Sequence, residues 1–433
     1  MSLNETPSGE RIHIGFFGAR NAGKSSLVNA VTGQELAVVS DIKGTTTDPV
    51  KKAMELLPLG PVVIIDTPGF DDEGELGTER VKRTREILKT CDIAVIVCNA
   101  GTGLTDTDRE LFVLTEERKI PCLTVWNKTD LSQKAPAPEG AVRVSTVTGE
   151  GIEELKERLA RLKPAGNERR LVGDLVKRGD LCILVCPIDE SAPKGRLILP
   201  QQQTIRDLME AGAIPVVCRD TELEDVLKKP GIEPAMVITD SQAFKKVAAI
   251  VPESIPLTSF SILMARYKGF LETAVKGVSA VKHLKDGDRV LMAEGCNHHR
   301  QCNDIGTVKI PRWLANHTGK ALSIETSSGN GFPEDLSPYS IVVHCGGCML
   351  TENAVLARME QAVESNVPFT NYGIAIAFMT GILERSLRLF PTLHSLIAED
   401  RPTAESTSKD SPMARLAAQS LPTAGSKTED RHG

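Results

Sequence analysis

The sequence predicts an α/β protein with three domains, each built around a parallel β-sheet, and a polar C-terminal tail. The chain has 433 residues, which is more than one compact core usually holds. Apolar runs typical of buried strands alternate with helical patterns along most of it, as in parallel sheets. Changes in composition and pattern divide it into residues 1–165, 171–265 and 266–395, with a tail over 396–433.

Composition and charge narrow the class of protein. Apolar residues make up 41% and charged residues 25%, which is typical of a soluble globular chain. A net charge of −6 argues against general binding to nucleic acid or to an anionic membrane. The start lacks a signal peptide, and the apolar run 373–383 is too short to span a bilayer. We therefore expect a cytoplasmic protein, whose ten cysteines serve as metal ligands, redox groups or core residues rather than disulfides.

Residues 12–31 are predicted to form a strand, a glycine-bearing loop and a helix. Gly18 is followed, after four residues, by Gly23, Lys24 and Ser25, which is the spacing of a P-loop. The glycines let backbone N–H groups and the helix N-terminus face phosphate oxygens. Lys24 is expected to reach the β- and γ-phosphates, and the Ser25 hydroxyl to bind Mg²⁺.

Two further motifs match the phosphate and metal end of such a site. "GTTTD" at 44–48 supplies Thr46 for Mg²⁺ and the γ-phosphate. "VVIIDTPGF" at 62–70 reads as a buried strand that ends in Asp66, which faces the magnesium ion. Gly69 in the same motif offers an N–H to the γ-phosphate.

The sequence also contains motifs that would bind the guanine base of the nucleotide. "LTVWNKTD" at 123–130 reads as a strand ending in Asn127, Lys128 and Asp130, and the Asp130 carboxylate can accept both N–H groups of the guanine edge. "VSTVTG" at 144–149 fits the loop that closes over the base. The motifs together predict an N-terminal P-loop GTPase domain with a doubly wound sheet, followed by two further parallel-sheet α/β domains. The candidate GTP-binding residues are Gly18, Asn21, Ala22, Gly23, Lys24, Ser25, Ser26, Thr46, Asp66, Gly69, Asn127, Lys128, Asp130, Ser145 and Thr146.

The residue after "DTPG" bears on how GTP would be hydrolysed. It is Phe70, where Ras-like enzymes have a water-orienting glutamine, and phenylalanine cannot orient water. In its P-loop Asn21 the domain resembles the potassium-activated GTPases of the MnmE and Era type, in which this asparagine helps to hold K⁺ against the phosphates. The alternative is that Asn21 only stabilises the loop. Lys24, Thr46 and Asn21 are the candidate catalytic residues.

The middle region, 171–265, alternates strands and helices without a phosphate loop or a cluster of polar residues. Cys182, Cys186 and Cys218 lie within apolar strand runs, where core packing is their expected role. A sheet domain without a site of its own suggests a role in assembly.

Two cysteine-bearing turns follow predicted strands in the third region. Cys296 follows the strand 290–293, and "HCGGC" at 344–348 follows the strand 341–344. Parallel strands present their C-terminal ends on one side, so Cys296, Cys345 and Cys348 should converge. The imidazoles of His298 and His344 lie beside them in the sequence, so this set is a candidate metal site.

Spacing alone does not identify the metal. Three cysteines and an exchangeable fourth ligand suit a [4Fe–4S] cluster, Cys₃His suits structural zinc, and CxxC suits a redox pair. Core packing is the remaining alternative. Cys302 is a further thiol, and Asp304 a further oxygen ligand, in the same loop.

The combination of an N-terminal potassium-type GTPase domain with CxH at 296–298 and HCxxC at 344–348 resembles the HydF family of [FeFe]-hydrogenase maturation GTPases. The similarity extends over residues 10–395 and includes "EGCNHHRQCNDIGTVKIPRW". It implies a three-domain scaffold with a middle dimerisation domain. Together with the open sheet predicted for 171–265, it suggests a homodimer formed through that region. It also implies a [4Fe–4S] cluster on Cys296, Cys345 and Cys348, with His298, His344, Asp304 or water as the fourth ligand.

The same resemblance implies cargo and partners. A transient diiron subcluster would be built by the radical-SAM enzymes HydE and HydG and passed to apo-[FeFe]-hydrogenase, with GTP, Mg²⁺ and K⁺ at the nucleotide site. Two other functions stay open at this point: a GTPase of ribosome or tRNA metabolism with a zinc-binding accessory domain, and a thiol–disulfide enzyme. The tail over 399–433, rich in Ser, Thr, Pro and charge, is expected to be disordered.

Overall fold

The computed structural model describes ten stretches of the chain. They are residues 8–34, 50–67, 82, 84–131, 136–162, 169–188, 197–229, 231–295, 304–329 and 331–398. The chain divides into two compact units, Met1–Leu389 and Phe390–Gly433. In the second unit the structure describes one helix, α14 (Pro391–Ala398). The predicted tail over 399–433 lies outside the described residues.

The N-terminal part of the first unit is a six-stranded sheet with strand order β2-β3-β1-β4-β5-β6, in which only β2 runs antiparallel to its neighbour. The strands are β1 (Ile12–Phe17), β2 (Val50–Leu56), β3 (Gly60–Asp66), β4 (Ile93–Asn99), β5 (Cys122–Asn127) and β6 (Val142–Arg143). Helices α1 (Lys24–Thr32), α3 (Asp106–Glu117) and α4 (Ile152–Arg161) connect them. The predicted doubly wound fold is therefore confirmed.

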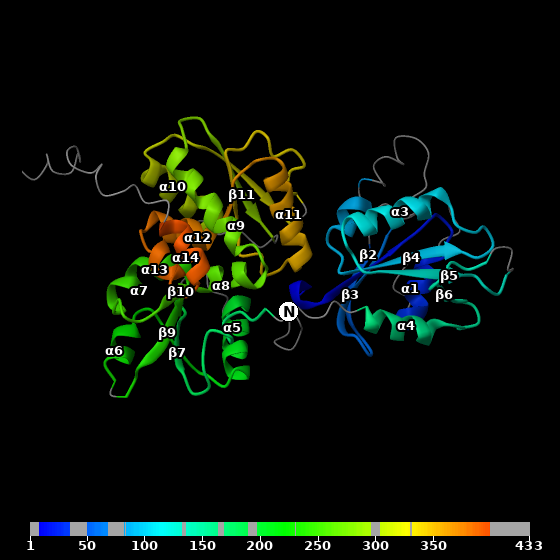
Figure 1. Cartoon of the computed structure of the whole chain (residues 1–433), viewed down its shortest axis with the longest axis horizontal. Coiled ribbons are helices and arrows are strands. Elements are labelled where there is room, and N and C mark those ends of the chain that lie inside the picture. The colour runs from blue at the N-terminus through cyan, green and yellow to red at the C-terminus, as the bar shows by residue number, and fades with distance from the viewer. Residues whose placement is uncertain are drawn as a thin grey trace, which may run out of the picture. The chain divides into compact units, whose positions relative to one another are not determined.

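Successive side chains of the buried strands point to opposite faces of this sheet, so an apolar core forms on each face. Ile14 and Phe16 of β1 pack with Leu27 of α1 on one face. Phe17 points to the opposite face and packs with Leu111 of α3. Figure 1 shows α3 on one side of the sheet and α1 and α4 on the other. Because both faces are covered by helices, the strands are apolar almost throughout, as is typical of parallel sheets.

A second, four-stranded parallel sheet has the order β10-β9-β7-β8. Its strands are β7 (Leu181–Val185), β8 (Ile214–Cys218), β9 (Pro234–Thr239) and β10 (Leu257–Ser259), and its helices are α5 (Leu199–Glu210), α6 (Leu223–Leu227), α7 (Phe244–Ile250) and α8 (Phe260–Tyr267). Cys182, Cys186 and Cys218 are buried free thiols, which confirms their expected place in the core.

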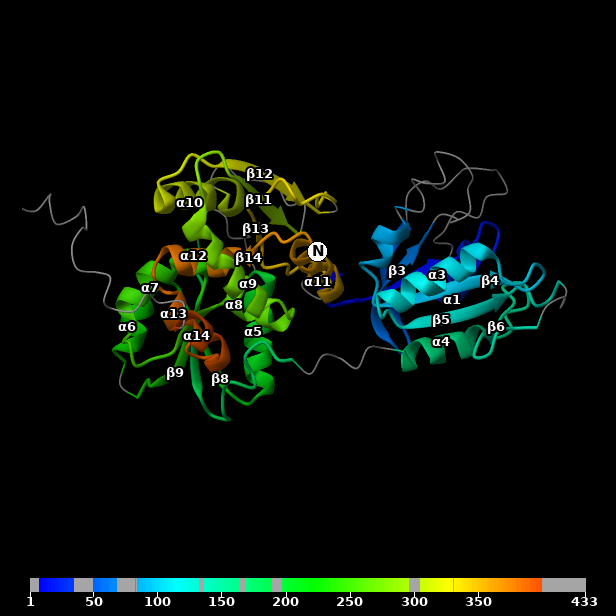
Figure 2. The ribbon, with the colours of Figure 1, turned by 45° about the horizontal axis from the view of Figure 1, so that its top comes forward.

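A third sheet is also four-stranded and parallel, with the order β12-β11-β13-β14. Its strands are β11 (Arg289–Glu294), β12 (Ser323–Ser328), β13 (Ile341–His344) and β14 (Phe369–Asn371), and its helices are α9 (Leu271–Gly277), α10 (Ile310–Thr318), α11 (Glu352–Glu364), α12 (Tyr372–Met379) and α13 (Leu383–Leu387). In Figure 2 the sheet lies with α10 and α11 near its ends. The register pairs Ala293 of β11 with His344 of β13, so the two strands that precede the cysteine turns are immediate neighbours.

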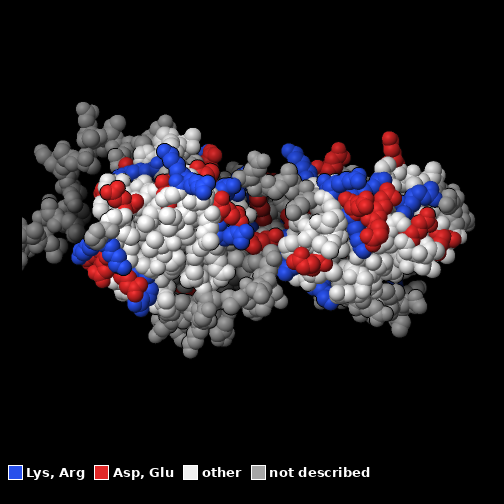
Figure 3. Space-filling view, turned by 90° about the horizontal axis from the view of Figure 1, so that it is seen from below, with Lys and Arg blue, Asp and Glu red and all other residues white. Residues whose placement is uncertain are grey.

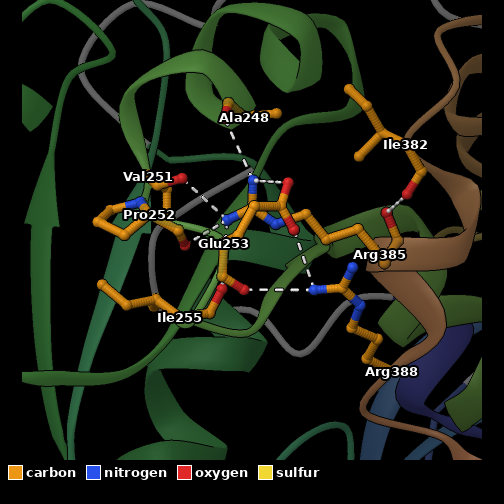
Figure 4. A network of polar contacts seen from close by, with 9 residues as sticks. Ala248, Val251, Pro252, Glu253, Ile255, Ile382, Arg385 and Arg388 are labelled. Atoms are coloured by element: carbon orange, nitrogen blue, oxygen red, sulfur yellow. Dashed lines mark hydrogen bonds and ion pairs between the residues drawn. The ribbon is translucent and has the colours of Figure 1, made fainter.

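One buried arginine fastens α13 to the chain that follows α7. The Arg385 guanidinium donates to the carbonyl oxygens of Val251 (2.9 Å) and Pro252 (2.6 Å), and it is 7% exposed (Figure 4). Glu253 forms ion pairs with both Arg385 (3.4 Å) and Arg388 (3.0 Å). A guanidinium carries several donors in a planar fork, so it can satisfy several carbonyls at once. Arg385 thereby joins the second and third sheet regions.

The surface charge and the apolar helices concern two predictions, that the protein does not bind nucleic acid or anionic membranes in general and that the run 373–383 does not span a bilayer. Figure 3 shows Lys and Arg interspersed with Asp and Glu on the face in view, so positive charge is not concentrated there among the described residues. The apolar run 373–383 forms most of α12 and the turn after it, and α12 is largely buried. Among the described residues, no helix is both long enough and apolar enough to cross a bilayer.

Candidate functional site

The P-loop connects the end of β1 to the start of α1. Gly18 has φ +144°, and a Cβ there would lie 2.3 Å from the Val97 carbonyl oxygen of the neighbouring β4, so only glycine fits. Asn21 (φ +57°) and Gly23 (φ +92°) continue the left-handed curl. Gly23 is the N-cap of α1 and gives it no side-chain cap, so the first N–H groups of the helix stay available to a phosphate.

Lys24 and Ser25 begin this helix, as the motif predicts. The Lys24 ammonium donates to the carbonyl oxygens of Gly18 (3.0 Å) and Ala19 (2.9 Å) and is 7% exposed. These contacts hold the ammonium inside the loop where the phosphates of a nucleotide would bind. Ala22 is buried behind the loop, and Ser26 is half-buried in the first turn of α1.

The metal end of the site joins β3 to α1. The Ser25 hydroxyl donates to Asp66 Oδ2 at 2.6 Å, and Asp66 Oδ1 is buried without a hydrogen-bond partner among the described residues. Burial raises the pKa of Asp66, while Ser25 and the nearby Lys24 oppose the rise. A hydroxyl beside a buried carboxylate with an unsatisfied oxygen fits Mg²⁺, which binds through oxygen ligands and its own waters.

The base end lies at the C-terminal end of β5. The Asn127 side-chain amide donates to Ala22 O (2.9 Å), and the Lys128 ammonium donates to Asn21 O (2.7 Å). Both residues thus tie the base-binding motif to the P-loop. A Cβ on Gly23 would lie 2.4 Å from Asn127 Nδ2, which explains a glycine at that position.

Asp130, the predicted guanine-recognition residue, is held by the loop after β6. The Ser145 hydroxyl donates to Asp130 Oδ1 at 2.7 Å and itself accepts from the backbone N–H groups of Val147 (3.3 Å) and Thr148 (3.2 Å). Thr146 lies half-buried in the same loop. The structure therefore brings the predicted residues of β1, β3, β5 and β6 to one edge of the sheet. Thr46, Gly69 and Phe70 lie outside the described residues.

The described end of β11 contacts the turn that holds Cys345 and Cys348. The Gly295 N–H, at the end of β11, donates to Cys345 Sγ at 3.1 Å, and the Gly347 N–H donates to the same sulfur at 3.4 Å. Gly347 has φ +64°, and a Cβ there would lie 2.8 Å from Val355 Cγ2. The described ends of β11 and β13 are therefore close together, and the predicted convergence of Cys296 with Cys345 and Cys348 stays a prediction. Cys296, His298 and Cys302 lie outside the described residues.

The two described thiols, Cys345 and Cys348, are half-buried free cysteines. Burial raises the pKa of Cys345, and the N–H groups of Gly347 and Gly295 and the charge of Arg358 oppose the rise. Burial, followed by the proximity of Cys345, raises the pKa of Cys348 to about 11. The thiols are therefore protonated near neutral pH in the absence of a metal, and metal binding would release their protons.

His344 and Asp304, two candidate fourth ligands, each have a structural role. The fully buried His344 places Nδ1 2.7 Å from Cys345 O and Nε2 3.1 Å from Arg358 Nη1, so both ring nitrogens form hydrogen bonds. Burial, with the charge of Arg358, lowers the pKa of His344 to about 3. Asp304 Oδ2 caps the π-helical turn Ile305–Lys309 by accepting from Gly306 N (3.0 Å) and Thr307 N (2.9 Å).

Within the part of the chain that the structure describes, no group of three or more His, Cys, Asp or Glu side chains is arranged to hold a metal ion. The predicted set can be complete only with Cys296 or His298, which belong to 296–303. Sequence reasoning missed two buried cations near the cysteine turn, Arg358 and Lys268. Arg358 belongs to an amphipathic helix and Lys268 precedes Cys345 by many residues, so neither carries a local motif.

Lys268 connects the cysteine turn to the residues that precede the first sheet. Its ammonium donates to Leu350 O (2.9 Å) and Gly9 O (3.3 Å), and it is 3% exposed. A Cβ on Gly9 would lie 2.7 Å from the carbonyl oxygens of Cys348 and Leu350. The chain just before β1 therefore packs closely against the backbone of the cysteine turn.

Comparison with protein families assigns all three regions. Residues 13–128 match the family described as 50S ribosome-binding GTPase. Residues 171–269 match the hydrogen maturase F dimerization domain, and residues 272–389 match the hydrogen maturase F tetramerization domain. The last family is named for tetramerization, whereas the sequence analysis predicted only a homodimer.

Curated relatives match the GTPase region. The tRNA modification GTPase MnmE of Nitrosomonas europaea is 36% identical over 171 residues, which are 38% of this chain and 37% of the relative. MnmE of Synechococcus sp. is 40% identical over 167 residues, 36% of this chain and 34% of the relative. GTPase Der of Wolinella succinogenes is 34% identical over 177 residues, 37% of each chain. The chain thus spans little more than a third of these relatives.

Solved structures are similar over the same region. Aquifex aeolicus Era bound to GDP·AlF₄⁻ has a TM-score of 0.32 and 18% identity, covering 48% of this chain and 94% of Era. The G domain of the T. maritima FeoB iron transporter has a TM-score of 0.29 and 24% identity, covering 36% of this chain and all of that domain. Because a GTPase domain with a complete P-loop is followed in one chain by both HydF-specific oligomerization domains, this chain belongs to the HydF family.

Proposed function

We propose that this HydF-family GTPase is a scaffold that holds a [4Fe–4S] cluster, carries the diiron precursor of a hydrogenase active site, and delivers it to apo-[FeFe]-hydrogenase. One observation carries the proposal: the Gly295 N–H lies 3.1 Å from Cys345 Sγ. This contact brings the chain that leads into Cys296 against the turn that holds Cys345 and Cys348. Three thiols from two adjacent strand ends would then face one cluster.

The chemistry of the donor set fits an iron–sulfur cluster. Two backbone N–H groups already point at Cys345 Sγ, and such donors stabilise thiolates and cluster sulfurs. A Cβ on Gly346 would meet no atom of the described residues within 4 Å, so among them there is room for a bulky group beside the turn. When bound, the cluster would supply an iron atom with an exchangeable ligand position to which the diiron cargo can attach.

We propose further that the fourth position of the cluster belongs to an exchangeable water or to His298. Both nitrogens of His344 have hydrogen-bond partners, and Asp304 caps a helical turn. Recruiting either residue would break these contacts and leave buried polar groups without partners, which costs about 1–3 kcal/mol for each.

At the nucleotide site, Lys24 and the N–H groups at the start of α1 bind the phosphates, while Ser25 and its hydrogen-bond partner Asp66 hold Mg²⁺. We propose that Thr46 and Gly69 complete the γ-phosphate contacts. Asn21 would hold K⁺ against the phosphates, where the cation supplies the positive charge that an arginine finger supplies elsewhere. The left-handed backbone of Asn21, with its carbonyl held by Lys128, places this residue at the loop surface.

We assign these roles to a GTPase domain (1–165), a dimerisation domain (171–265) and a cluster domain (266–395). Strand β8 is an edge of the second sheet within the described residues, and its Ile214 and Val217 are 52% and 44% exposed. An exposed apolar edge strand needs a partner, and a second copy of the chain would supply one. We propose that the oligomer acts in the cytoplasm and receives its cargo from HydE and HydG.

The rival function of a tRNA- or ribosome-directed GTPase with a zinc site rests on relatives that match only the GTPase region. Metal analysis of protein purified without oxygen separates the two functions. The proposal expects iron and acid-labile sulfide and, after reduction, an electron paramagnetic resonance (EPR) signal of a [4Fe–4S]⁺ cluster. Stoichiometric zinc without iron would refute it, and a metal-free protein with a reversible Cys345–Cys348 disulfide would favour a thiol–disulfide enzyme.

A further inference from the structure

Arg358, on α11, is a buried cation directly behind the cysteine turn. It is 9% exposed, and its guanidinium donates to His344 Nε2 (3.1 Å), to Glu294 O (3.3 Å) and to Gly329 O. These acceptors lie at the C-terminal ends of three neighbouring strands, β13, β11 and β12. One planar fork thus fixes the strand ends from which the cysteine turns depart, which a lysine with a single ammonium cannot do.

Through its contact with His344, Arg358 also orients Cys345. Because Arg358 always donates, His344 Nε2 must accept, and the ring proton of the neutral imidazole then sits on Nδ1. Nδ1–H donates to Cys345 O at 2.7 Å. The ring also packs on Phe369, with centroids 5.6 Å apart. The Cys345 peptide is therefore held in one orientation by a chain of contacts that begins at Arg358.

The charge of Arg358 has no carboxylate partner in the described part of the chain. Its described acceptors are two carbonyls and one imidazole. A negative charge on Cys345 would favour the charged form of the Arg358 guanidinium. A buried cation without an anion is costly, so the site is suited to a negative group. A [4Fe–4S] cluster on three thiolates carries net negative charge, and its charge grows by one electron on reduction.

We infer that Arg358 is a positioning residue of the cluster site, which fixes the Cys345 turn through His344 and provides the buried counter-charge that sets the cluster's reduction potential. The inference rests on the proposed function. The charge lies behind the turn, shielded from water, where electrostatic effects are weakly screened. It therefore stabilises the reduced, more negative state of the cluster relative to the oxidised state.

The test compares full-length protein with Arg358→Met and Arg358→Lys, each reconstituted anaerobically. EPR-monitored redox titration gives the midpoint potential, and iron and sulfide analysis gives the cluster content. Arg289→Met is the matched control, because Arg289 begins β11, about 17 Å along that strand from Glu294, whose carbonyl Arg358 contacts, and is half-exposed beside Glu325. The control should keep the potential of the unmodified protein.

Arg358→Met should shift the midpoint potential to more negative values, whereas Arg358→Lys, which keeps the charge, should show little of this shift. An Arg358→Met potential equal to that of the control would overturn the inference, and so would equal shifts in both Arg358 variants. If Arg358→Met takes up no iron, Arg358→Lys decides: cluster at the original potential supports the counter-charge, and a folded, iron-free protein refutes it. Absence of a cluster from the unmodified protein would instead refute the proposed function.

Discussion

The Asn353 side-chain amide donates a hydrogen bond to Asp92 Oδ1 at 3.0 Å and another to Cys91 O at 3.1 Å. Asn353 opens the helix that follows the cysteine turn, and Asp92 precedes β4 of the GTPase sheet. The second oxygen of Asp92 accepts from the His13 N–H of β1 at 2.8 Å. β1 runs from this junction to the P-loop, so one strand joins the surroundings of the cysteine turn to the nucleotide site.

His13 and Asp92 at this junction predict that the stabilities of His13→Asn and Asp92→Asn depend on pH in opposite directions. Burial lowers the pKa of His13 to about 4, so its stabilising effect is full above pH 6.5 and is lost as the pH falls toward 4. Burial raises the pKa of Asp92 to about 6, so its stabilising effect is full below pH 4 and is lost as the pH rises toward 6. Each effect is worth about 2–3 kcal/mol, and in the native chain the two nearly cancel.

His13→Asn removes one contribution and Asp92→Asn the other. Relative to the unmodified protein, His13→Asn should lose stability as the pH rises from 4.5 to 6.5, and Asp92→Asn should lose it as the pH falls over the same range. Thermal unfolding midpoints at three pH values across this range measure both slopes. Parallel pH profiles for the two variants would show that the buried pair does not titrate as described.

Asp130 should determine the choice of nucleotide. Its carboxylate, oriented by Ser145 at 2.7 Å, can accept two guanine N–H groups, and facing adenine it would be left without them. We expect Asp130→Asn to weaken the preference for GTP over ATP by roughly 2–4 kcal/mol, and Ser145→Ala to weaken it less. Competition binding of labelled GTP against ATP measures the preference. Equal affinities in the unmodified protein would contradict this assignment.

Potassium should accelerate GTP hydrolysis through Asn21. A K⁺ ion near the phosphates would stabilise the charge of the transition state, which Na⁺, with its shorter ligand distances, would do less well. Rates in matched KCl and NaCl should differ in the unmodified protein, and Asn21→Ala should abolish the difference while leaving a slow basal rate. Lys24→Ala should lower hydrolysis in both salts. Identical rates in the two salts would leave Asn21 as a loop-stabilising amide.

Arg385 should contribute far more to stability than its neighbour Arg388. Arg385→Met removes the donor to the buried contact with the Val251 carbonyl and to the part-buried contact with the Pro252 carbonyl, and we expect a loss of about 3 kcal/mol. Arg388 is half-exposed and pairs with Glu253 at the surface, so Arg388→Ala should cost about 1 kcal/mol or less. Urea denaturation followed by circular dichroism compares the two. Similar losses would mean that the carbonyl contacts of Arg385 contribute little.

The sequence predicted those parts of the protein whose structure depends on residues that are close together in the chain. The P-loop is recognisable because Gly18 and Gly23 must adopt left-handed backbone next to β4 and Asn127, and the parallel strands because both of their faces are apolar. The rule that parallel strands end on one side predicted that the two strands before the cysteines end at the same edge of the sheet. Their order within the sheet, β12-β11-β13-β14, did not follow from it.

Long-range partners explain what the sequence could not reveal. Nothing near Arg358 in the chain indicates that its guanidinium meets His344, because helix positions of this kind usually face solvent. The hydrogen bonds of His344 likewise depend on a helix that begins several residues later, so they cannot be predicted from its place beside two cysteines. Lys268 meets Gly9 and Leu350, which are remote from it in the sequence.

The most direct test of the account is the iron and sulfide content, with EPR, of anaerobically reconstituted Cys345→Ser and Cys348→Ser beside Cys296→Ser. Cys122→Ser, a half-buried thiol of β5, is the control. Loss of any one thiolate leaves two for the cluster, so each of the three variants should lose most of its iron and its EPR signal, while the control keeps both. Full iron content in Cys296→Ser or Cys345→Ser, or zinc in place of iron in the unmodified protein, would contradict the account.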